Sequence, residues 1–299
     1  MEQQRNCHIC PRNCTGMNNA DKIGVCGVPR NRIRIARAAL HMWEEPCISG
    51  NAGSGAVFFS GCPLRCIYCQ NYEIAGGKVG KEITMERLTD IFLELQEQGV
   101  ANINLVTPTH YTPQIIPALE RAKEQGLHLP IVYNCSGYEK LETLQKLNGL
   151  IDIYLTDFKY MDTEVAKRFS RAEDYPQVAQ IALEEMIRQQ GEPVFDAQGM
   201  MQQGVIVRHL LLPNHLKNGK KVVRYVYETY GNQVYLSLMN QYTPLPQVAD
   251  IPELNRKVTK REYESLIDYA IYLGVENGFI QEGETAEESF IPPFNNEGV

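Results

Sequence analysis

The stretch that decides the fold reads Ser60-Gly61-Cys62-Pro63-Leu64-Arg65-Cys66-Ile67-Tyr68-Cys69-Gln70-Asn71, and its three cysteines have the spacing C-x3-C-x2-C. The run Gly55-Ala56-Val57-Phe58-Phe59 directly before it predicts a short buried strand. Thiolates this close together on a loop are soft ligands, which suit iron–sulfur clusters or zinc. Three thiolates leave one iron of a four-iron cubane without a protein ligand, and that iron is open to bind and activate a small molecule.

Two simpler explanations of these cysteines fit the sequence less well. A zinc knuckle generally needs a fourth ligand, and the loop offers none nearby. A disulfide requires an oxidising compartment, but the chain starts Met1-Glu2-Gln3-Gln4-Arg5 and lacks the apolar segment of a secretory signal. We therefore expect a cytoplasmic protein with reduced cysteines and an iron–sulfur cluster at this loop.

The loop resembles the cluster loop of the radical S-adenosylmethionine (radical SAM) superfamily, in which C-x3-C-x2-C follows the first strand and an aromatic residue, here Tyr68, precedes the last cysteine. The resemblance implies that Cys62, Cys66 and Cys69 hold a [4Fe–4S] cluster, that SAM chelates the open iron through its amino and carboxylate groups, and that Tyr68 belongs to the cofactor site. It also implies that one electron from the cluster cleaves SAM to methionine and a 5′-deoxyadenosyl radical, which abstracts hydrogen from a substrate. A reducing partner such as flavodoxin or ferredoxin is expected to supply the electron.

A second cysteine group lies near the start of the chain. Cys7, Cys10, Cys14 and Cys26 have the spacing C-x2-C-x3-C-x11-C, and glycines beside Cys26 permit the tight turns of a metal site. Four thiolates can saturate one zinc ion or one iron–sulfur cubane. Zinc knuckles usually contain two C-x2-C pairs and this group has one, which favours a second iron–sulfur cluster and leaves structural zinc open. Four unrelated reduced cysteines are the remaining explanation.

The composition is that of an ordinary globular protein. The 299 residues are 43% hydrophobic and 22% charged, with a formal net charge of −7. This acidic balance gives no sign of a surface for nucleic acid, and no apolar run is long enough to span a membrane. We therefore expect neither nucleic acid nor a membrane among the partners.

Apolar runs alternate with amphipathic segments after the three-cysteine loop. The expected strands cover residues 55–59, 102–106, 130–134, 151–156, 204–212 and 233–238. The expected helices cover 84–99, 113–125, 139–147, 175–189, 219–230 and 259–273, and a β-hairpin is expected over 192–204. This alternation predicts an α/β fold with a parallel sheet and helices outside it. Six strands match an incomplete (βα)6 barrel, which is the architecture of the radical SAM superfamily.

These elements predict three parts of the chain. Residues 1–50 form a cysteine-rich metal-binding segment and lead-in, residues 51–250 form the partial barrel, and residues 251–299 form a helix and tail that pack on the barrel. Within the first part, residues 32–42 are expected to be extended and Cys47 to be a small buried side chain. Within the last, the apolar residues 290–295 are expected to fold back over the barrel.

The carboxyl ends of the strands of a parallel barrel carry its chemistry. The second strand leads into Thr107-Pro108-Thr109. Many radical SAM enzymes have a Gly-Gly-Glu stretch here that receives the amino group of SAM, and this chain does not. Carbonyl and hydroxyl groups of Thr107 and Thr109 are candidates to replace it, and Asn134 at the end of the third strand is a further candidate to bind SAM.

The fourth and fifth strands carry charged residues at their ends. Asp157 and Lys159 point the same way by strand alternation, and an Asp-x-Lys here resembles activating enzymes of the pyruvate formate-lyase type. The pair is a candidate to bind the ribose or carboxylate of SAM, and the alternative is a structural ion pair. Arg208 lies in an apolar strand, where a charge is costly unless paired, and its guanidinium suits the carboxylate of SAM. The alternative for Arg208 is a surface position.

The strand ends together resemble uncharacterised relatives of pyruvate formate-lyase activating enzymes that carry an N-terminal cysteine motif. The resemblance implies a radical SAM enzyme, whose target is either a glycyl-radical partner protein or a peptide or small molecule. A different class, a non-enzymatic iron–sulfur protein for electron transfer or scaffolding, is the alternative. No residue is assigned a catalytic role of its own.

Overall fold

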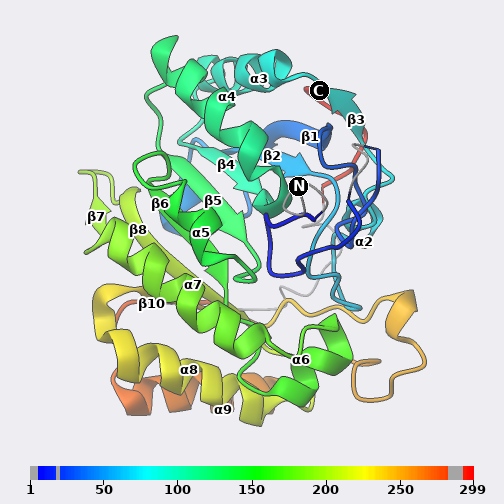
Figure 1. The fold of residues 1–299 in the computed structure, drawn as a ribbon. Coiled ribbons are helices and arrows are strands. Elements are labelled where there is room, and N and C mark those ends of the chain that lie inside the picture. The colour runs from blue at the N-terminus through cyan, green and yellow to red at the C-terminus, as the bar shows by residue number, and fades with distance from the viewer. Residues whose placement is uncertain (1–5, 18–20, 282–291) are drawn as a thin grey trace.

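The computed structural model describes residues 6–17, 21–281 and 292–299. Their strands form one sheet in the order β10-β9-β8-β6-β5-β4-β2-β1-β3, with β7 paired to β8 outside this order. Figure 1 shows the sheet with helices packed along its outer face. The parallel strands are β2 (Ser54–Phe59), β4 (Ile103–Val106), β5 (Ile131–Cys135), β6 (Ile153–Asp157), β8 (Met201–Leu210), β9 (Tyr235–Met239) and β10 (Gly278–Ile280).

The six strands expected from the sequence are thus confirmed, and they pair in parallel as an open barrel. Three elements extend this sheet with antiparallel pairing. β1 (Ile33–His41) pairs with β2, and β3 (Lys81–Ile83) pairs with β1 at the sheet edge. β7 (Val194–Phe195) pairs with β8, which confirms the hairpin expected over 192–204. The extended lead-in expected over 32–42 is therefore a strand of the sheet, because its backbone pairs on both sides.

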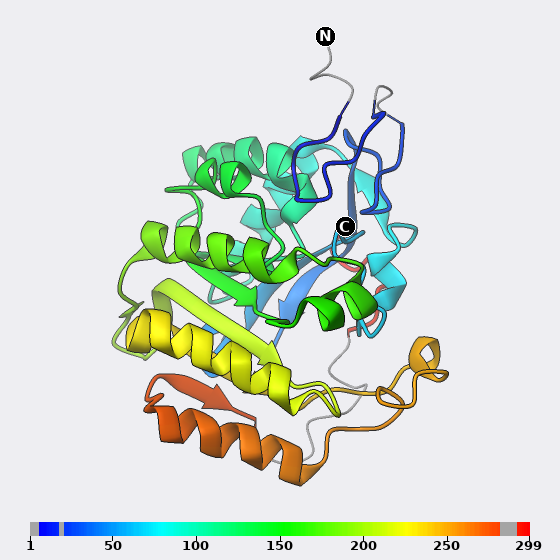
Figure 2. The ribbon, with the colours of Figure 1, turned by 60° about the horizontal axis from the view of Figure 1, so that its bottom comes forward.

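The expected helices are also confirmed, and local sequence explains their ends. The Thr84 side chain accepts a hydrogen bond from the Arg87 backbone at the start of α3, and Thr259 and Glu262 form a capping box at the start of α9. The main helices, several of which are clear in Figure 2, are α3 (Met85–Glu97), α4 (Thr112–Glu124), α5 (Leu141–Gln145), α6 (Thr163–Ser170), α7 (Tyr175–Gln190), α8 (Leu216–Tyr230) and α9 (Lys260–Leu273).

Some short elements were not expected from the sequence. α6 is the longest of them, and Asp162 caps it by accepting hydrogen bonds from the backbone of Glu164 and Val165. The others are β3 and β10, which have three residues each, and the short helices α1 (Pro46–Ser49), α2 (Tyr72–Ala75), η2 (Thr109–Tyr111), η3 (Gly231–Gln233) and η4 (Pro246–Val248). Segments this short contain few periods of apolar residues, so their patterns do not stand out.

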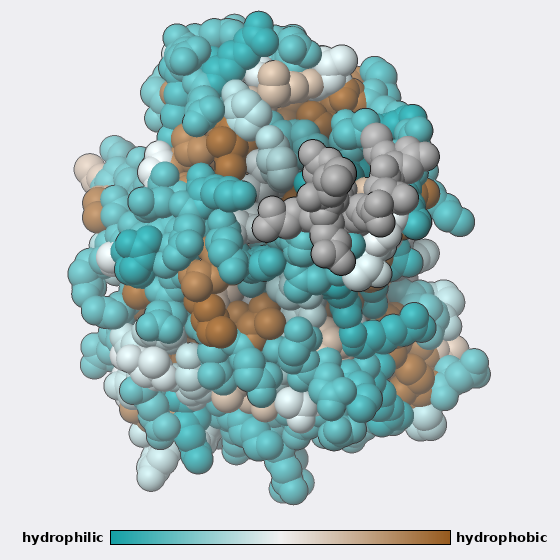
Figure 3. Space-filling view, viewed as in Figure 1, coloured by the Kyte–Doolittle hydropathy of each residue, from teal (hydrophilic) through white to brown (hydrophobic). Residues whose placement is uncertain are grey.

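Hydrophilic side chains cover most of the surface that Figure 3 shows in the view of Figure 1, and apolar side chains gather there only in small patches. This distribution agrees with helices that turn their apolar faces to the sheet. Among the described residues, no helix combines the length and apolar character needed to cross a membrane.

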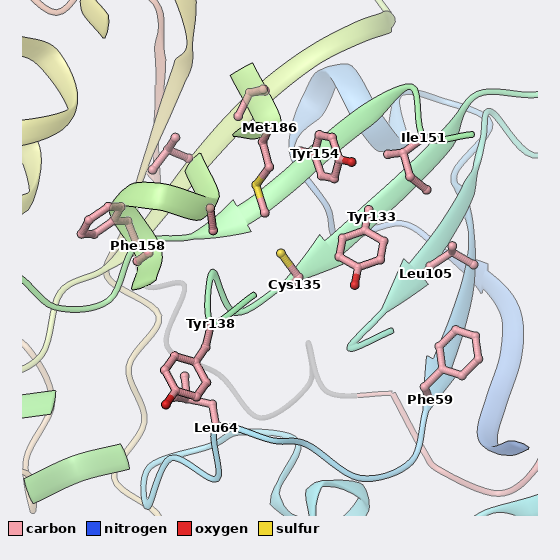
Figure 4. Close-up of a cluster of buried hydrophobic side chains, with 14 of the residues drawn as sticks. Phe59, Leu64, Leu105, Tyr133, Cys135, Tyr138, Ile151, Tyr154, Phe158 and Met186 are labelled. Atoms are coloured by element: carbon pink, nitrogen blue, oxygen red, sulfur yellow. The ribbon is translucent and has the colours of Figure 1, made fainter. Parts of the chain in front are cut away.

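The main core lies between the sheet and the outer helices. Figure 4 shows Tyr133 and Cys135 of β5 and Tyr154 of β6 on the face of the sheet that also meets Met186 of α7. The rings of Tyr133 and Tyr154 meet edge to face, with centroids 5.8 Å apart, a favourable aromatic geometry. Because side chains alternate along a strand, the residues between these positions point to the inside of the barrel.

The inside of the barrel is filled at the amino ends of the strands by residues 46–49, which form α1. Cys47 and Ile48 are buried there against inward-facing side chains of the strands, namely Val132, Ile153, Leu155 and Ile206. The Asn102 amide donates to the Ile48 carbonyl at 2.7 Å and holds the segment in place. The expectation that Cys47 is buried is confirmed, and the carboxyl ends of the strands remain open for a site.

Residues 292–299 lie along β1. The Ala38 backbone N–H donates to the Glu297 carbonyl at 2.9 Å, and the Phe294 ring contacts Phe58 with centroids 5.6 Å apart. The described part of the expected tail, residues 292–295, therefore folds back on the barrel, whereas residues 290 and 291 lie outside the described residues. The sheet takes strands from all three expected parts of the chain, and the boundaries at 50 and 250 stay a prediction.

Candidate active site

A cavity opens at the carboxyl ends of the parallel strands. It is bordered on one side by the three-cysteine loop (residues 60–71) and on the other by the ends of the strands. Its lining includes six of the seven residues predicted to bind cofactor and all three cysteines of the loop: Cys62, Cys66, Tyr68, Cys69, Thr107, Asn134, Asp157, Lys159 and Arg208. The structure therefore brings to one place residues that are far apart in the sequence.

The three-cysteine loop starts directly after β2, and Gly61 gives it a tight turn. Gly61 has φ +89°, and a Cβ on it would lie 2.6 Å from the Cys26 carbonyl oxygen, so a side chain there would clash. The Cys69 backbone N–H donates to the Cys66 carbonyl at 3.3 Å, which keeps the second and third cysteines in one turn. The loop geometry thus depends on glycine where the chain leaves the strand.

Burial disfavours the charged form of the loop thiols. It raises the pKa of Cys69 to about 12 and also raises the pKa of Cys62, and neighbouring cysteines add to both effects. The Lys159 ammonium acts in the opposite direction on both pKa values. Because only thiolates bind iron or zinc, a metal centre at this loop is helped by the nearby lysine.

In residues 6–17, 21–281 and 292–299, no three cysteine, histidine or carboxylate side chains adopt the arrangement of ligands around a metal ion. The ligand sets of both cysteine groups therefore stay predictions. The chemistry of the donors nevertheless suits a cluster at the loop, because three thiols of one short turn face a cavity beside a lysine.

Four charged side chains meet across the cavity from the loop, and we call Glu44, Asp157, Lys159 and Arg208 the buried charge network. Lys159 Nζ lies 2.6 Å from Asp157 Oδ2, Arg208 Nε donates to Asp157 Oδ1 at 3.2 Å, and Arg208 Nη1 donates to Glu44 Oε2 at 3.1 Å. Each of the four side chains is 16% exposed or less, so the ion pairs are shielded from bulk water and are strong.

The pairing outweighs burial for the two charges at the end of β6. Burial alone raises the pKa of Asp157, but the positive charges of Lys159 and Arg208 hold that pKa below its ordinary value. Burial lowers the pKa of Lys159, but Asp157 and Cys66 bring it to about 12. At neutral pH the carboxylate and the ammonium are therefore both charged.

Glu44 is a site residue that sequence reasoning missed. It lies in the segment before the first barrel strand, which runs inside the barrel, and its Oε1 accepts hydrogen bonds from the Asn104 amide at 2.9 Å and the Asn134 amide at 3.2 Å. The available signal was the acidic pair Glu44-Glu45 directly before Pro46. Two carboxylates are unusual in a segment that leads into a buried strand, and they indicate a buried cation nearby. In the structure, the cation that pairs with Glu44 is Arg208.

Asn134 and Arg208 bind each other. Arg208 Nη2 donates to the Asn134 side-chain oxygen at 2.6 Å. All three guanidinium nitrogens of Arg208 thus donate to protein groups. The surface alternative for Arg208 is excluded by its 15% side-chain exposure, and direct contact between Arg208 and SAM stays a prediction.

The two threonines at the end of β4 have different surroundings. Thr107 lines the cavity and has φ +60°, a left-handed conformation that is strained for a β-branched residue. Thr109 starts η2, is 1% exposed, and donates to Glu139 Oε1 at 2.7 Å. The structure therefore brings Thr107 to the cavity and turns Thr109 away from it, because the chain bends into a helical turn one residue after Pro108.

Ser136 is a second lining residue outside the predicted set. Its Oγ is buried and has no hydrogen-bond partner among the described residues. A buried hydroxyl without a partner costs free energy, and this one faces the cavity. A bound ligand with a polar group can satisfy it.

Glu139 gives a pH-dependent prediction. Burial raises its pKa from 4.5 to about 8, so the carboxyl is neutral in the folded protein at neutral pH. As the pH rises from about 4.5 to about 8, the unfolded chain loses this proton first, and the stabilisation present at low pH is lost. We expect the free energy of unfolding, measured in urea, to fall over this range by a few kcal/mol relative to Glu139→Gln, since one pKa unit is worth about 1.4 kcal/mol.

Glu142→Gln is the matched control for Glu139→Gln, because Glu142 is an exposed carboxyl three residues further along the chain. Its stability curve is expected to run parallel to that of the unaltered protein. A parallel curve for Glu139→Gln as well would show that Glu139 ionises alike in the folded and unfolded states.

The N-terminal cysteine segment (residues 7–17 and 21–26) packs against the three-cysteine loop. Burial raises the pKa of Cys10 to about 12 and of Cys26 to about 11, and the other N-terminal cysteines add to both shifts. The Val25 backbone N–H donates to Cys14 Sγ at 3.4 Å. The Cys7 backbone N–H also donates to the Cys14 carbonyl at 2.8 Å, and one metal site formed by all four cysteines stays a prediction.

Comparison with known proteins gives a family match for part of the chain. Residues 56–190 match the sequence model described as the radical SAM superfamily. A similar protein is the uncharacterized protein MJ0674 of Methanocaldococcus jannaschii, 27% identical over 274 residues, which are 89% of this chain and 74% of that protein. The pyruvate formate-lyase-activating enzyme of Clostridium pasteurianum is 34% identical over 113 residues, which are 36% of this chain and 46% of that enzyme.

Two solved structures share the fold. Methylornithine synthase (PylB) superposes on 88% of this chain and 72% of its own with a TM-score of 0.52 and 14% identity. The [FeFe]-hydrogenase maturase HydG superposes on 82% of this chain and 56% of its own with a TM-score of 0.52 and 16% identity. The expected architecture, an incomplete (βα)6 barrel with α/β layers, is confirmed.

Residues 56–190 match the radical SAM superfamily, and part of the chain is related to an activating enzyme. The family match implies an enzyme that uses a [4Fe–4S] cluster and SAM. The family match includes the three-cysteine loop and the ends of β4, β5 and β6, so it covers most of the cavity wall described above.

Proposed function

We propose that this enzyme cleaves SAM reductively at the three-cysteine loop and uses the resulting radical to abstract hydrogen from a substrate. The observation that carries the proposal is the placement of Cys62, Cys66 and Cys69 opposite the buried charge network in one cavity. Cys62, Cys66 and Cys69 would hold the [4Fe–4S] cluster, which supplies the electron for the cleavage when it is bound. The other residues of the cavity bind and orient SAM.

Lys159 is suited to two tasks. Among the described residues, its ammonium donates one hydrogen bond, to Asp157. Two of its three N–H groups can therefore serve a ligand carboxylate. Its positive charge, kept by a pKa of about 12, also lies beside the loop thiols. A cation at that place favours the extra negative charge that reduction brings.

Asp157, Glu44 and Asn134 hold the two cations of the network in place. Each cation is bound by at least one fixed oxygen, which limits the loss of side-chain entropy when a ligand binds. The cavity is closed at the other end of the barrel by the apolar side chains around Ile48, and these keep water from the site on that side. A reactive radical needs such protection from solvent.

Formation of 5′-deoxyadenosine tests the proposal. Anaerobically reconstituted protein reduced with dithionite is expected to convert SAM to 5′-deoxyadenosine and methionine, and a Cys69→Ala variant is expected to form neither. Equal amounts of 5′-deoxyadenosine from both proteins would rule out the proposed reaction and leave the alternative of a non-enzymatic iron–sulfur protein.

We further propose that the target of the radical is a glycyl-radical partner protein. The support is the partial similarity to a pyruvate formate-lyase-activating enzyme together with the Asp157–Lys159 pair at the end of β6. A glycyl radical on a co-purified partner, seen by electron paramagnetic resonance, is the expected result. Hydrogen abstraction from a peptide or small molecule in the absence of such a partner would favour the second candidate.

Ser136→Ala separates ligand binding from stability. The Ser136 hydroxyl has no partner among the described residues, so its removal is expected to leave the melting temperature unchanged or raised. If the hydroxyl binds SAM, its removal weakens the binding free energy of SAM by about 0.5–1.5 kcal/mol, and the dissociation constant for SAM rises accordingly. Ser54→Ala is the converse control, because the buried Ser54 hydroxyl donates to Asn102 and its loss should lower the melting temperature with unchanged SAM affinity. Unaltered affinity in Ser136→Ala would remove Ser136 from the SAM site.

A further inference from the structure

Arg12 joins the N-terminal cysteine segment to the three-cysteine loop. Its Nε donates to the Pro63 carbonyl at 2.8 Å, and its Nη2 donates to the Leu64 carbonyl at 3.0 Å. Both carbonyls lie in the C-x3-C part of the loop, while Arg12 itself lies between the second and third N-terminal cysteines. The side chain thus spans from one cysteine group to the other.

The same guanidinium also binds the end of α6. Nη2 donates to the Ser170 carbonyl at 2.8 Å and Nη1 to the Arg171 carbonyl. Carbonyls at a helix carboxyl terminus lack partners within the helix and attract a cation. Four backbone carbonyls from two segments therefore hold one side chain, and this planar fork fixes the loop relative to α6.

Ser170, at the end of α6, reaches a cysteine of the loop. Its Oγ donates to Cys66 Sγ at 3.1 Å, and Oγ also lies 2.8 Å from the Tyr160 hydroxyl. The Tyr160 hydroxyl is in turn 2.6 Å from that of Tyr68. A hydrogen bond to a cluster sulfur raises the reduction potential of an iron–sulfur centre. The position of α6 therefore decides whether Cys66 has this bond.

A second contact ties the two cysteine groups through the backbone. The Cys62 N–H donates to the Cys26 carbonyl at 3.0 Å. The backbone segments around Gly27 and Gly76 are packed closely here. A Cβ on Gly27 would lie 2.3 Å from the Gly76 carbonyl oxygen. A shift of Cys26 is thus passed directly to Cys62.

We propose that Arg12 is a positioning residue through which the N-terminal cysteine segment controls the potential of the cluster at the three-cysteine loop. The inference rests on the proposed function only in taking that loop as the cluster site. Metal at the N-terminal cysteines fixes the segment around Arg12, Arg12 holds the end of α6 against the loop, and Ser170 then donates to Cys66. Release of the segment breaks the Ser170 bond to Cys66 while Cys62, Cys66 and Cys69 stay the ligands of the cluster.

The reduction potential of the loop cluster tests this inference without SAM turnover. It is measured by redox titration with electron paramagnetic resonance, on protein reconstituted with iron and sulfide. We expect Arg12→Ala and Ser170→Ala each to shift the potential to more negative values and to change the signal of the reduced cluster. Arg30→Ala is the matched control, because Arg30 is an exposed arginine of the same region, and it should leave the potential unchanged.

A double-mutant cycle distinguishes positioning from a separate electrostatic effect. If Arg12 acts through Ser170, the Arg12→Ala, Ser170→Ala double variant has the potential of Ser170→Ala alone. If Arg12→Ala fails to load with iron, Arg12→Lys takes its place, since it keeps the charge and loses the fork, and it should show part of the shift. Cys7→Ser with Cys10→Ser should reproduce the shift of Arg12→Ala, because it frees the segment.

Several results overturn the inference. They are an unchanged potential in loaded Arg12→Ala or Arg12→Lys, additive shifts in the double variant, or an unchanged potential after the N-terminal cysteines are replaced. Failure of the proposed function is recognised separately: the unaltered protein would then hold a reducible cluster and form no 5′-deoxyadenosine.

Discussion

Replacement of Cys62, Cys66 and Cys69 together by alanine is expected to reduce formation of 5′-deoxyadenosine to the level of protein-free controls. The loop has three thiols and faces the cavity, so it can hold a cluster with an iron open to SAM, whereas four N-terminal thiols would leave no open position. The measurement is chromatographic detection of 5′-deoxyadenosine after anaerobic reduction. Residual formation at the rate of the unaltered protein would place the reaction at another centre.

The metal content of the same triple variant reports on the N-terminal cysteines in isolation. Iron close to four per chain with matching sulfide would mean a second cluster, and zinc close to one per chain would mean a structural knuckle. We expect iron, because the C-x2-C-x3-C opening has one close pair. A folded protein without metal would show that Cys7, Cys10, Cys14 and Cys26 form no metal site.

Replacement of Arg208 by alanine is expected to weaken both SAM binding and the fold. A lost charge-assisted contact should reduce SAM affinity by about 1.5–3 kcal/mol. The sequence alone suggests that the fold is affected less, but in the structure Arg208 neutralises Glu44 and shares Asp157 with Lys159. Breaking a buried pair costs about 3–5 kcal/mol, so we expect a clearly lower free energy of unfolding in urea.

Two variants separate these effects. Arg208→Lys keeps a cation for Glu44 and loses the fork, so it should recover more stability than affinity. Lys260→Ala is the surface control, because Lys260 and its partner Glu264 are 88% and 55% exposed, and its cost should stay below about 1 kcal/mol. Unchanged SAM affinity together with a lowered melting temperature in Arg208→Ala would assign Arg208 to structure.

Much of the cavity follows from strand alternation and the rule that parallel strands end at one edge. Both rules depend only on backbone geometry, so the sequence predicts that Asn134, Asp157 and Arg208 meet, and in the structure they bind one another directly or through a shared partner. The prediction is weaker where the strand ends. Thr109 is three residues beyond the expected end of its strand, and a helical turn there changes its direction.

Contacts made by irregular segments could not be predicted in this way. Glu44 reaches the network because residues 43–50 run inside the barrel, and no period in the sequence marks that path. Arg12 binds carbonyls of Pro63 and Ser170, and backbone carbonyls are present in every residue and give no sequence signal. α6 was missed because eight residues are too few for a clear pattern.

The segment inside the barrel has a consequence for the order of folding. Cys47 and Ile48 contact Val132, Ile153 and Ile206, and all of these partners come later in the chain. During synthesis the segment therefore leaves the ribosome before any parallel strand does. The parallel strands therefore assemble around residues 46–49, which have already been synthesised. This segment does not have to be inserted into a barrel that has already formed.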